Sequence, residues 1–326
     1  MTLARSKRPV RKVLVTGAGG FLGSRLVRKL LSGTADLPEI QQIVALDMSA
    51  CLVEDPRVDV RTGTITNTDC IRAAIADDVD VVYHLAAVVS GQAEADFDLG
   101  MEVNIDASRA VLEACRRLDH ASRFIFSSSL AVFGGELPDI VPEDMALFPR
   151  SSYGAQKAIA ELLVNEYSRR GFIDGIVCRL PTVTVRPGRP NAAASSFVSG
   201  IIREPLAGVE SICPVPLDTR LWISSPGAVT DNLVHAATLA AEDLSGRRAL
   251  NLPGLCVTPA QMLDSLERLG GKEARMRVRY EEDARIMDIV CSWPGALDIS
   301  RSLALGFRAD RDFDAVVRQY RAECAR

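Results

Sequence analysis

Tyr153 and Lys157 are two residues whose types and spacing suggest chemistry in this 326-residue chain. They are four positions apart in SSYGAQK, so a helix would place both side chains on one face, one turn apart. A phenol is a poor base near neutral pH unless a nearby cation stabilises its phenolate, and Lys157 can supply that cation. This spacing is common by chance, and it gains weight from a serine cluster, Ser127 to Ser129, that ends the preceding predicted strand. Together these residues predict a general acid–base site.

A glycine-rich turn, TGAGGFLG over residues 16–23, passes directly from a strand-like run into a predicted helix. Such a turn directs backbone N–H groups and the positive end of the helix dipole at an anion. Gly17, Gly20 and Gly23 form GxxGxxG, which departs from the general GxGxxG dinucleotide fingerprint. A tight turn needed only for packing would also use glycine. The position of the turn, between the first strand and the first helix, favours a dinucleotide site.

Asp47 ends the second predicted strand, where a carboxylate can accept hydrogen bonds from an adenosine ribose. A carboxylate there repels a 2′-phosphate, and the three residues that follow, Met48, Ser49 and Ala50, offer no cation to hold one. A solvated strand-end aspartate is the weaker interpretation, given the glycines before it. We therefore expect NAD as the cofactor, in preference to NADP.

Short β-branched runs alternate with amphipathic stretches from Val13 to about Pro181. This alternation predicts an α/β fold, a doubly wound parallel sheet of the Rossmann type. Strands are expected at Lys12–Thr16, Gln42–Asp47, Val58–Thr62, Val79–Leu85, Arg123–Ser128 and Gly175–Leu180. Helices are expected at Phe21–Ser32, Cys70–Ala76, Asn104–Arg117 and Ser152–Arg170.

After Pro181 the chain becomes rich in Pro, Gly and small residues, which indicates loops that face a substrate or begin a second domain. We expect an NAD-binding Rossmann domain over residues 1–185, with return segments near 220–256. Residues 186–326 then form a smaller C-terminal substrate-binding region. Further helices are expected at Ala228–Glu242, Pro259–Leu269 and Asp312–Glu323.

The composition is that of an ordinary globular protein, with 48% hydrophobic and 25% charged residues. The 38 basic and 42 acidic side chains give a net charge of −4, which argues against disorder and against nucleic-acid binding. No stretch approaches the roughly 20 apolar residues of a membrane helix. The basic N-terminal residues lack an apolar segment after them, so we expect neither a secretory signal nor a membrane partner.

The eight cysteines are scattered, without a CxxC and without short spacing to any of the three histidines. We therefore expect no metal site and no disulfide framework. Scattered cysteines without an export signal are typical of a reducing compartment, so the expected location is the cytoplasm.

These motifs resemble the extended short-chain dehydrogenase/reductase superfamily, also called the NAD-dependent epimerase/dehydratase family. The resemblance is carried, in order, by TGAGGFLG, Asp47, HLAA at 84–87, Asn104, FSSSLAVFG at 126–134 and YGAQK at 153–157. It implies that Tyr153 is the acid/base, that Lys157 lowers its pKa and holds the nicotinamide ribose, and that Ser129 hydrogen-bonds the reacting oxygen. It also implies a set of cofactor-contacting residues: Gly17, Gly20, Phe21, Leu22, Gly23, Asp47, Leu85, Ala86, Asn104, Tyr153 and Lys157.

Two departures from the family pattern bear on the ligands. Where the family has an aspartate that contacts adenine, this chain has Gly63-Thr64-Ile65, so that contact is in doubt although Ile65 can still pack on the ring. The stretches RLPTVTVRPGRPNAAASSF and RLWISSPGAVTDNLVHA also lack residues typical of nucleotide-sugar enzymes.

Those stretches are instead similar to a branch that uses NAD to oxidise the 2-hydroxyl of a four-carbon sugar acid. A 2-hydroxy acid needs a cation for its carboxylate, and Arg186 and Arg189 lie in the loop that enters the substrate region. Ser90 and Gln92 are candidates to hold substrate hydroxyls, although loop rigidity explains them equally well.

Two alternatives stay open, a nucleotide-sugar epimerase or dehydratase that retains NAD, and a non-enzymatic NAD-sensing module. The intact Ser129, Tyr153 and Lys157 argue against the module. We also expect a homodimer, because family members often dimerise through faces that correspond to the helices Asn104–Arg117 and Ser152–Arg170, although the same apolar stripes would serve as core.

Overall fold

A seven-stranded sheet forms the centre of the computed structural model, which describes residues 12–33, 37, 40–75, 78–190, 192–244 and 246–325. The strand order is β10-β6-β5-β4-β1-β2-β3, and every neighbouring pair is parallel. The strands are β1 Lys12–Thr16, β2 Gln42–Asp47, β3 Val58–Thr62, β4 Val81–His84, β5 Arg123–Ser129, β6 Asp174–Leu180 and β10 Ala249–Asn251. The predicted doubly wound α/β fold is confirmed.

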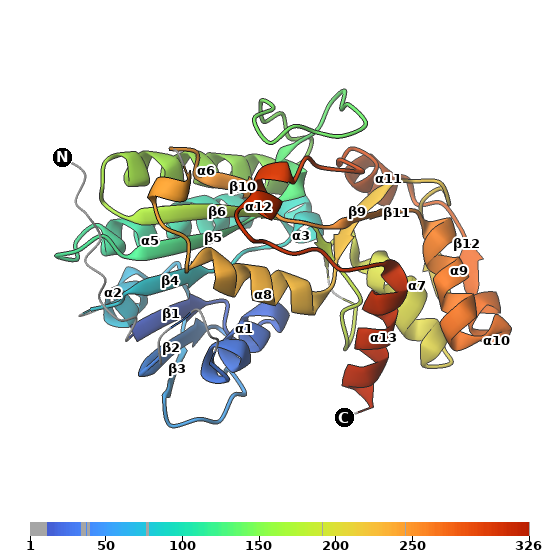
Figure 1. Ribbon diagram of the computed structural model, residues 1–326, viewed down its shortest axis with the longest axis horizontal. Coiled ribbons are helices and arrows are strands. Elements are labelled where there is room, and N and C mark those ends of the chain that lie inside the picture. Colours follow the sequence, from blue (N-terminus) through green and yellow to red (C-terminus); the bar gives the residue numbers. More distant parts are fainter. Residues whose placement is uncertain are drawn as a thin grey trace.

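Helices cover both faces of this sheet, which explains why its central strands are nearly continuous apolar runs. Along β1, Val13 and Val15 pack on the face covered by α1 and α8, while Leu14 packs on the face covered by α2, α5 and α6. Figure 1 shows these layers, with most of the later helices gathered beyond one end of the sheet. The helices on the sheet are α1 Phe21–Leu31, α2 Thr68–Ile75, α5 Ser108–Cys115, α6 Ser152–Arg169 and α8 Pro226–Ala236.

The helix expected at Asn104–Arg117 begins earlier and is less regular than its periodicity suggested. The chain runs through α3 Ser90–Ala95, α4 Phe97–Met101 and a π-helix, Glu102–Ala107, before α5 starts at Ser108. A π-helical turn is rare and tends to occur at functional sites. Here it carries Asn104.

The C-terminal region packs around its own apolar cluster, beside the carboxyl ends of the strands. It holds a three-stranded sheet, β11-β9-β7, and a two-stranded sheet, β12-β8. Its strands are β7 Thr182–Val183, β8 Ser211–Cys213, β9 Leu221–Ser224, β11 Leu255–Val257 and β12 Val278–Tyr280. Its helices are α7 Ser196–Leu206, α9 Pro259–Gly270, α10 Lys272–Met276, α11 Ala284–Val290 and α13 Phe313–Cys324. The short helix α12 Ser300–Ala304 lies instead beside β10 of the large sheet.

Part of the second half of the chain returns to the large sheet. β10 pairs with β6 through Ala249, Leu250 and Asn251, and α8 packs against α1.

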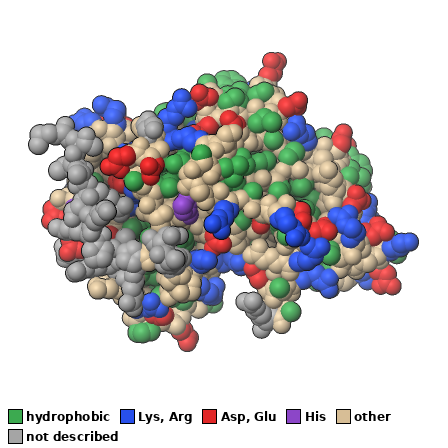
Figure 2. Space-filling model, viewed as in Figure 1, with side chains coloured by type: hydrophobic (Ala, Val, Ile, Leu, Met, Phe, Trp, Pro, Cys, Tyr) green, Lys and Arg blue, Asp and Glu red, His purple; other side chains and the backbone are tan. Residues whose placement is uncertain are grey.

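On the face in Figure 2, acidic and basic side chains are interspersed over the described part of the surface. Within the described residues, none of the helices is long and apolar enough to cross a membrane.

Candidate active site

A cavity of about 380 Å³ lies at the carboxyl ends of β1, β4, β5 and β6, where ligands bind in open parallel sheets. The glycine-rich turn, the loop after β4, the end of β5 and the start of α6 form its walls, together with the segment after β6 and Trp293. It is lined by Gly17, Gly20, Phe21, Leu22, Gly23, Leu85, Ala87, Val89, Ser90, Ser127, Ser128, Ser129, Leu130, Tyr153, Lys157, Leu180, Pro181, Thr182, Val183, Arg186, Ala193, Ser195 and Trp293.

Three of the four glycines of the turn, those of the GxxGxxG pattern, have different roles. Gly17 has a φ of +75°, and a Cβ there would lie 2.8 Å from the backbone nitrogen of Ala86. A Cβ on Gly23 would lie 2.0 Å from the carbonyl oxygen of Gly17, so this glycine allows α1 to approach the turn. A Cβ on Gly20 would meet only that oxygen, at 3.2 Å, and Gly20 precedes the N-terminus of α1. The turn therefore forms an open cradle at a helix N-terminus, which fits the diphosphate of NAD.

Asp47 is held in a fixed orientation at the end of β2. Its Oδ2 accepts a hydrogen bond from the Gly19 N–H at 3.1 Å, and its Oδ1 accepts one from the Ser49 N–H at 2.9 Å. These bonds fix a negative charge beside the glycine-rich turn. Asp47 does not line the cavity itself, and its predicted contact with the adenosine ribose stays a prediction.

The acid–base residues lie at the start of α6. Ser151 caps this helix, since its Oγ accepts the Gly154 N–H at 3.2 Å. Lys157 is buried, with Nζ donating to the carbonyl oxygen of Ser127 at 2.8 Å and lying 5.8 Å from the centre of the Tyr153 ring. Ser129 is the last residue of β5, and its Oγ also accepts the Ala131 N–H at 3.2 Å. The cavity therefore brings Ser129, Tyr153 and Lys157 together.

Burial sets the proton affinities of these groups. It raises the pKa of Tyr153 to about 12, and a hydrogen bond with Ser129 acts in the opposite direction. Burial lowers the pKa of Lys157 to about 7, and the negative charge of Glu161 opposes this shift. The fully buried His84 has its pKa lowered to about 3, first by burial and then by the charge of Lys157, so it is neutral near pH 7. Burial dominates the pKa of Tyr153, and the expected lowering of that pKa by Lys157 stays a prediction.

Asn104, predicted to contact the cofactor, lies behind the cavity wall rather than in it. Its Oδ1 accepts the Val88 N–H at 2.8 Å, and its Nδ2 donates to the Val88 carbonyl at 3.1 Å and to Gln156 Oε1 at 2.7 Å. It fixes the loop after β4 to α6. Ile65 is 6% exposed within the core, which leaves little of its side chain for an adenine ring.

The substrate candidates lie in different places. Ser90 is buried and lines the cavity, with its Oγ accepting the Ala194 N–H at 3.2 Å. Gln92 is exposed and is not among the lining residues. Arg186 lines the cavity, and its guanidinium carbon lies 5.2 Å from the centre of the Phe21 ring. Arg189 does not line it.

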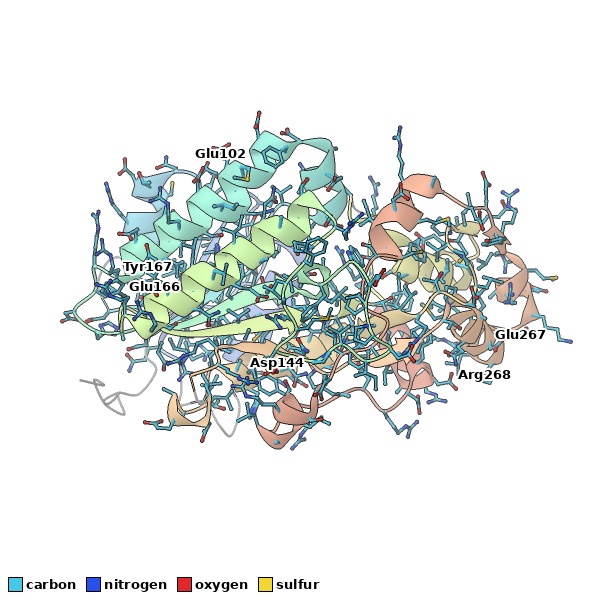
Figure 3. All side chains as sticks on the ribbon, turned by 90° about the horizontal axis from the view of Figure 1, so that it is seen from above. Glu102, Asp144, Glu166, Tyr167, Glu267 and Arg268 are labelled. Atoms are coloured by element: carbon cyan, nitrogen blue, oxygen red, sulfur yellow. The ribbon has the colours of Figure 1, made fainter. Side chains whose placement is uncertain are left out.

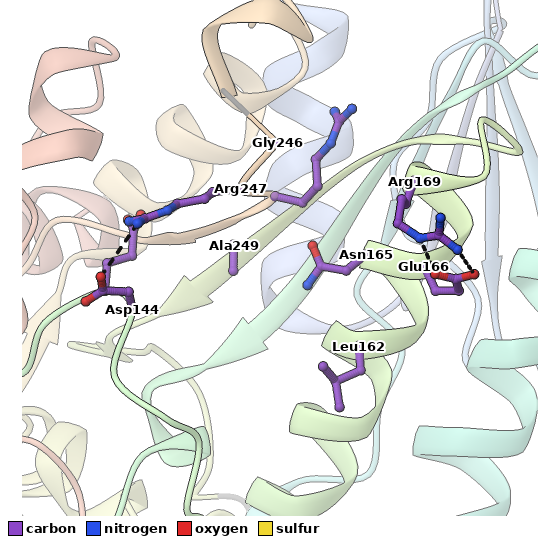
Figure 4. Close-up of a pocket in the computed structure, with 10 residues that line it drawn as sticks. Asp144, Leu162, Asn165, Glu166, Arg169, Gly246, Arg247 and Ala249 are labelled. Carbon is purple, nitrogen blue, oxygen red and sulfur yellow. Dashed lines mark hydrogen bonds and ion pairs between the residues drawn. The ribbon is translucent and has the colours of Figure 1, made fainter. Parts of the chain in front are cut away.

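A second cavity, of about 540 Å³, lies between the outer face of α6 and residues 246–249 (Figure 4). Its charged side chains are paired, with Arg169 bonded to Glu166 at 2.7 Å and Arg247 lying 3.6 Å from Asp144. It shares no lining residue with the first cavity, so Tyr153 and Lys157 do not reach it. We therefore place the active site in the smaller cavity.

A family model described as "NAD dependent epimerase/dehydratase family" matches residues 13–222, which include every residue of the acid–base site and the glycine-rich turn. The chain belongs to the NAD-dependent epimerase/dehydratase family. The cofactor predicted from the glycines and Asp47, NAD, is thereby confirmed.

Two relatives within this family match almost the whole chain. A D-erythronate dehydrogenase of Cupriavidus necator is 55% identical over 314 residues, covering 94% of this chain and 97% of that protein. A D-erythronate dehydrogenase of Haemophilus influenzae is 46% identical over 311 residues, covering 95% of this chain and 98% of that protein. A crystal structure described as a nucleoside-diphosphate-sugar epimerase from Agrobacterium tumefaciens is 36% identical, with a TM-score of 0.87 and coverage of 97% of this chain and 96% of that chain.

Among the residues that the sequence did not indicate, Trp293 and Glu161 bear most on this site. Trp293 follows α11 and closes the cavity from the C-terminal region, and no local motif marks it as a site residue. Glu161 follows Lys157 by one helical turn and is 1% exposed. A carboxylate at four-residue spacing from Lys157 was the signal that could have indicated Glu161.

Proposed function

We propose that this protein oxidises the 2-hydroxyl of D-erythronate to give 2-dehydro-D-erythronate, with NAD as the hydride acceptor. The observation that carries the proposal is the convergence of Ser129, Tyr153, Lys157 and Arg186 in one small cavity next to the glycine cradle. The two near-full-length relatives named D-erythronate dehydrogenase support the choice of acid.

In this mechanism Tyr153 is the general base. As a phenolate it takes the proton of the substrate 2-hydroxyl, while the hydroxyl of Ser129 donates a hydrogen bond to the reacting oxygen. Lys157 stabilises the phenolate through its positive charge. When bound, NAD supplies the acceptor for the hydride that leaves C2. Tyr153 would hold the proton until it passes to solvent, and the loss of the hydride from C2 would leave a carbonyl there, so protons and electrons balance.

Arg186 is the proposed ligand for the substrate carboxylate. The Ser199 hydroxyl accepts its backbone N–H at 3.0 Å, and Arg203 donates to its carbonyl oxygen at 2.8 Å, so the segment that carries it is fixed from two sides. A guanidinium matches a carboxylate with two parallel hydrogen bonds. Ser90 and Gln92 remain proposed ligands for substrate hydroxyls, and of these Ser90 lines the cavity.

A nucleotide-sugar epimerase or dehydratase that retains NAD is the second candidate. The 36% identical structure described as a nucleoside-diphosphate-sugar epimerase favours it. Such an enzyme would use the same Tyr153 and Lys157 but would consume no free NAD.

NADH formation at 340 nm distinguishes the two candidates. Purified protein is assayed with NAD and four- to six-carbon sugar acids, including D-erythronate, with Tyr153→Phe as the variant. We expect turnover of D-erythronate and a loss of at least about a hundredfold in Tyr153→Phe, because general base catalysis contributes about 10² to 10⁴ in rate. NADH binding by the variant, followed by fluorescence, should be unchanged. If none of the acids gives NADH, while NAD remains bound through purification and a UDP- or GDP-sugar binds, the epimerase or dehydratase would be favoured.

We also propose a homodimer that acts in the cytoplasm. The π-helix and α6 run side by side across one face, where Glu102, Glu166 and Tyr167 are labelled (Figure 3). Within α6, Ile159 is 42% exposed and Leu162 is 65% exposed. Light scattering of the wild type and of Leu162→Glu tests the dimer, which the added charge should weaken. Cytoplasmic action is consistent with eight cysteines that are all free thiols.

A further inference from the structure

Glu161 lies one helical turn beyond Lys157, so Tyr153, Lys157 and Glu161 follow one another along a single face of α6. We propose that Glu161 is a positioning residue, whose buried carboxylate fixes the end of β5 on which the site is built and places a negative charge one helical turn from Lys157. Arg179, on β6, holds Glu161 in place. The inference rests on the proposed dehydrogenation for its kinetic readout.

The contacts of Glu161 join it to the reacting groups. The Ser128 hydroxyl donates to its Oε1 at 2.5 Å. Ser128 stands between Ser127, whose carbonyl oxygen accepts the Lys157 ammonium, and Ser129, the proposed ligand of the reacting oxygen. Glu161 therefore fixes the three-residue segment that positions both the cation and the hydroxyl.

Arg179 fixes Glu161 from the opposite side. Its Nη2 donates to Oε2 at 2.9 Å and its Nε to Oε1 at 3.1 Å, and both side chains are almost completely buried. Its Nη1 donates to the carbonyl oxygen of Glu143 at 2.8 Å, and its guanidinium carbon lies 4.8 Å from the centre of the Phe133 ring. Arg179 and Ser128 therefore fix the orientation of the Glu161 carboxylate, whose side chain is 1% exposed.

The Glu161 carboxylate affects the protonation state of Lys157. Among the described residues, Tyr153 and Glu161 of α6 and His84 of β4 are the titratable side chains around Lys157. Arg179 of β6 lies behind Glu161, and Arg186, after β7, lines the same cavity as Lys157. Burial disfavours the ammonium form and lowers the pKa of Lys157 to about 7, while Glu161 raises it. Glu161 thus supplies the opposing charge that keeps Lys157 able to stabilise a phenolate at working pH.

Two substitutions should shift the pH dependence of kcat in opposite directions. Lys157 acts when protonated, so activity is lost as the pH rises through its pKa. Glu161→Gln removes an anion and lowers this pKa further, so the alkaline limb should move down by about one pH unit, with about a tenfold loss of kcat above it. Arg179→Gln removes a cation and leaves the carboxylate unneutralised, so the limb should move up. Glu161→Asp should restore most of the wild-type profile.

The control is Glu166→Gln, an exposed residue on the same helix that pairs with Arg169. It should leave the profile and the NADH affinity unchanged. Melting temperatures identify variants that have only lost stability, and the double variant Glu161→Gln/Arg179→Gln removes both buried charges in case a single change prevents folding. Shifts in the same direction, or a folded Glu161→Gln enzyme with an unchanged alkaline limb, would overturn the proposal.

A separate readout keeps this test distinct from that of the proposed function. If the wild type fails to oxidise any of the acids, the proposed function fails and kinetics cannot be used. The Lys157 amine is then titrated directly, by NMR of the protein after ¹³C reductive methylation, with Lys157→Arg to assign its signal. A lower Lys157 pKa in Glu161→Gln than in the wild type supports the inference, and equal values refute it.

Discussion

Gly20 and Gly23 belong to one motif, but the structure predicts different consequences of substituting each by alanine. Gly20 has φ −73° and ψ 171°, which alanine adopts without strain, and the added Cβ would lie 3.2 Å from the Gly17 carbonyl oxygen. The methyl group would point into the open cradle. We expect Gly20→Ala to retain its stability while its dissociation constant for NADH rises at least about tenfold, which corresponds to about 1.4 kcal/mol.

Gly23→Ala should lower the stability of the protein more than its affinity for NADH. The added Cβ would lie 2.0 Å from the Gly17 carbonyl oxygen and 2.7 Å from the Ala18 Cα, and backbone atoms cannot move aside cheaply. Overpacking of this kind costs about 3 kcal/mol at the severe end, and the better helix propensity of alanine returns about 1 kcal/mol. A net loss of about 2 kcal/mol lowers the melting temperature by about 3 °C, taking the usual unfolding entropy per residue over 326 residues.

Both variants are measured without substrate, by thermal melting followed by circular dichroism and by NADH fluorescence titration. Wild-type NADH affinity in Gly20→Ala would refute the assignment of the cradle to the diphosphate. A wild-type melting temperature in Gly23→Ala would refute the packing argument. The two results are independent, because one concerns binding and the other the free energy of unfolding.

Two further predictions concern charged residues. Arg186→Met should raise the KM for D-erythronate about 10- to 100-fold, because a hydrogen bond to a charged group contributes about 1.5–3 kcal/mol. An unchanged KM with a weakened NADH affinity would instead assign Arg186 to the cofactor. Asp174→Asn should lower the free energy of unfolding by about 3–5 kcal/mol in urea titrations and leave KM unchanged. The reason is that it removes the charge partner that lies 2.6 Å from the fully buried Arg123. A loss below about 1 kcal/mol would show that the charge of Arg123 is compensated elsewhere.

The large sheet could be predicted from the sequence because its signals are local. β-branched runs bounded by turn residues gave β1, β2 and β3 at their observed bounds, and Tyr153 and Lys157 were found by helical spacing. β8, β10, β11 and β12 have three residues each, too few for any periodicity to appear. They exist because distant segments pair with them.

The site could be predicted from the sequence only where its signals, like those of the large sheet, are local. The glycines, Ser129 and the tyrosine–lysine pair follow the strands that position them, so order along the chain indicated their proximity. Trp293 reaches the cavity only through the packing of the C-terminal region. Asn104 was placed in a regular helix, whereas the observed π-helical turn directs it at Val88, and a 3.6-residue period cannot reveal such a turn.

β10 has a consequence for aggregation. It covers the outer edge of β6, where the Val177 N–H donates to the Arg248 carbonyl oxygen at 2.8 Å and the Leu252 N–H donates to the Arg179 carbonyl oxygen at 3.0 Å. An uncovered edge of a long apolar strand is a template for pairing between chains. A fragment that ends near residue 185 would retain the glycine cradle and the acid–base residues and yet expose this edge. During synthesis the same edge stays open until β10 has emerged, so three residues from the second half of the chain protect the first half from self-association.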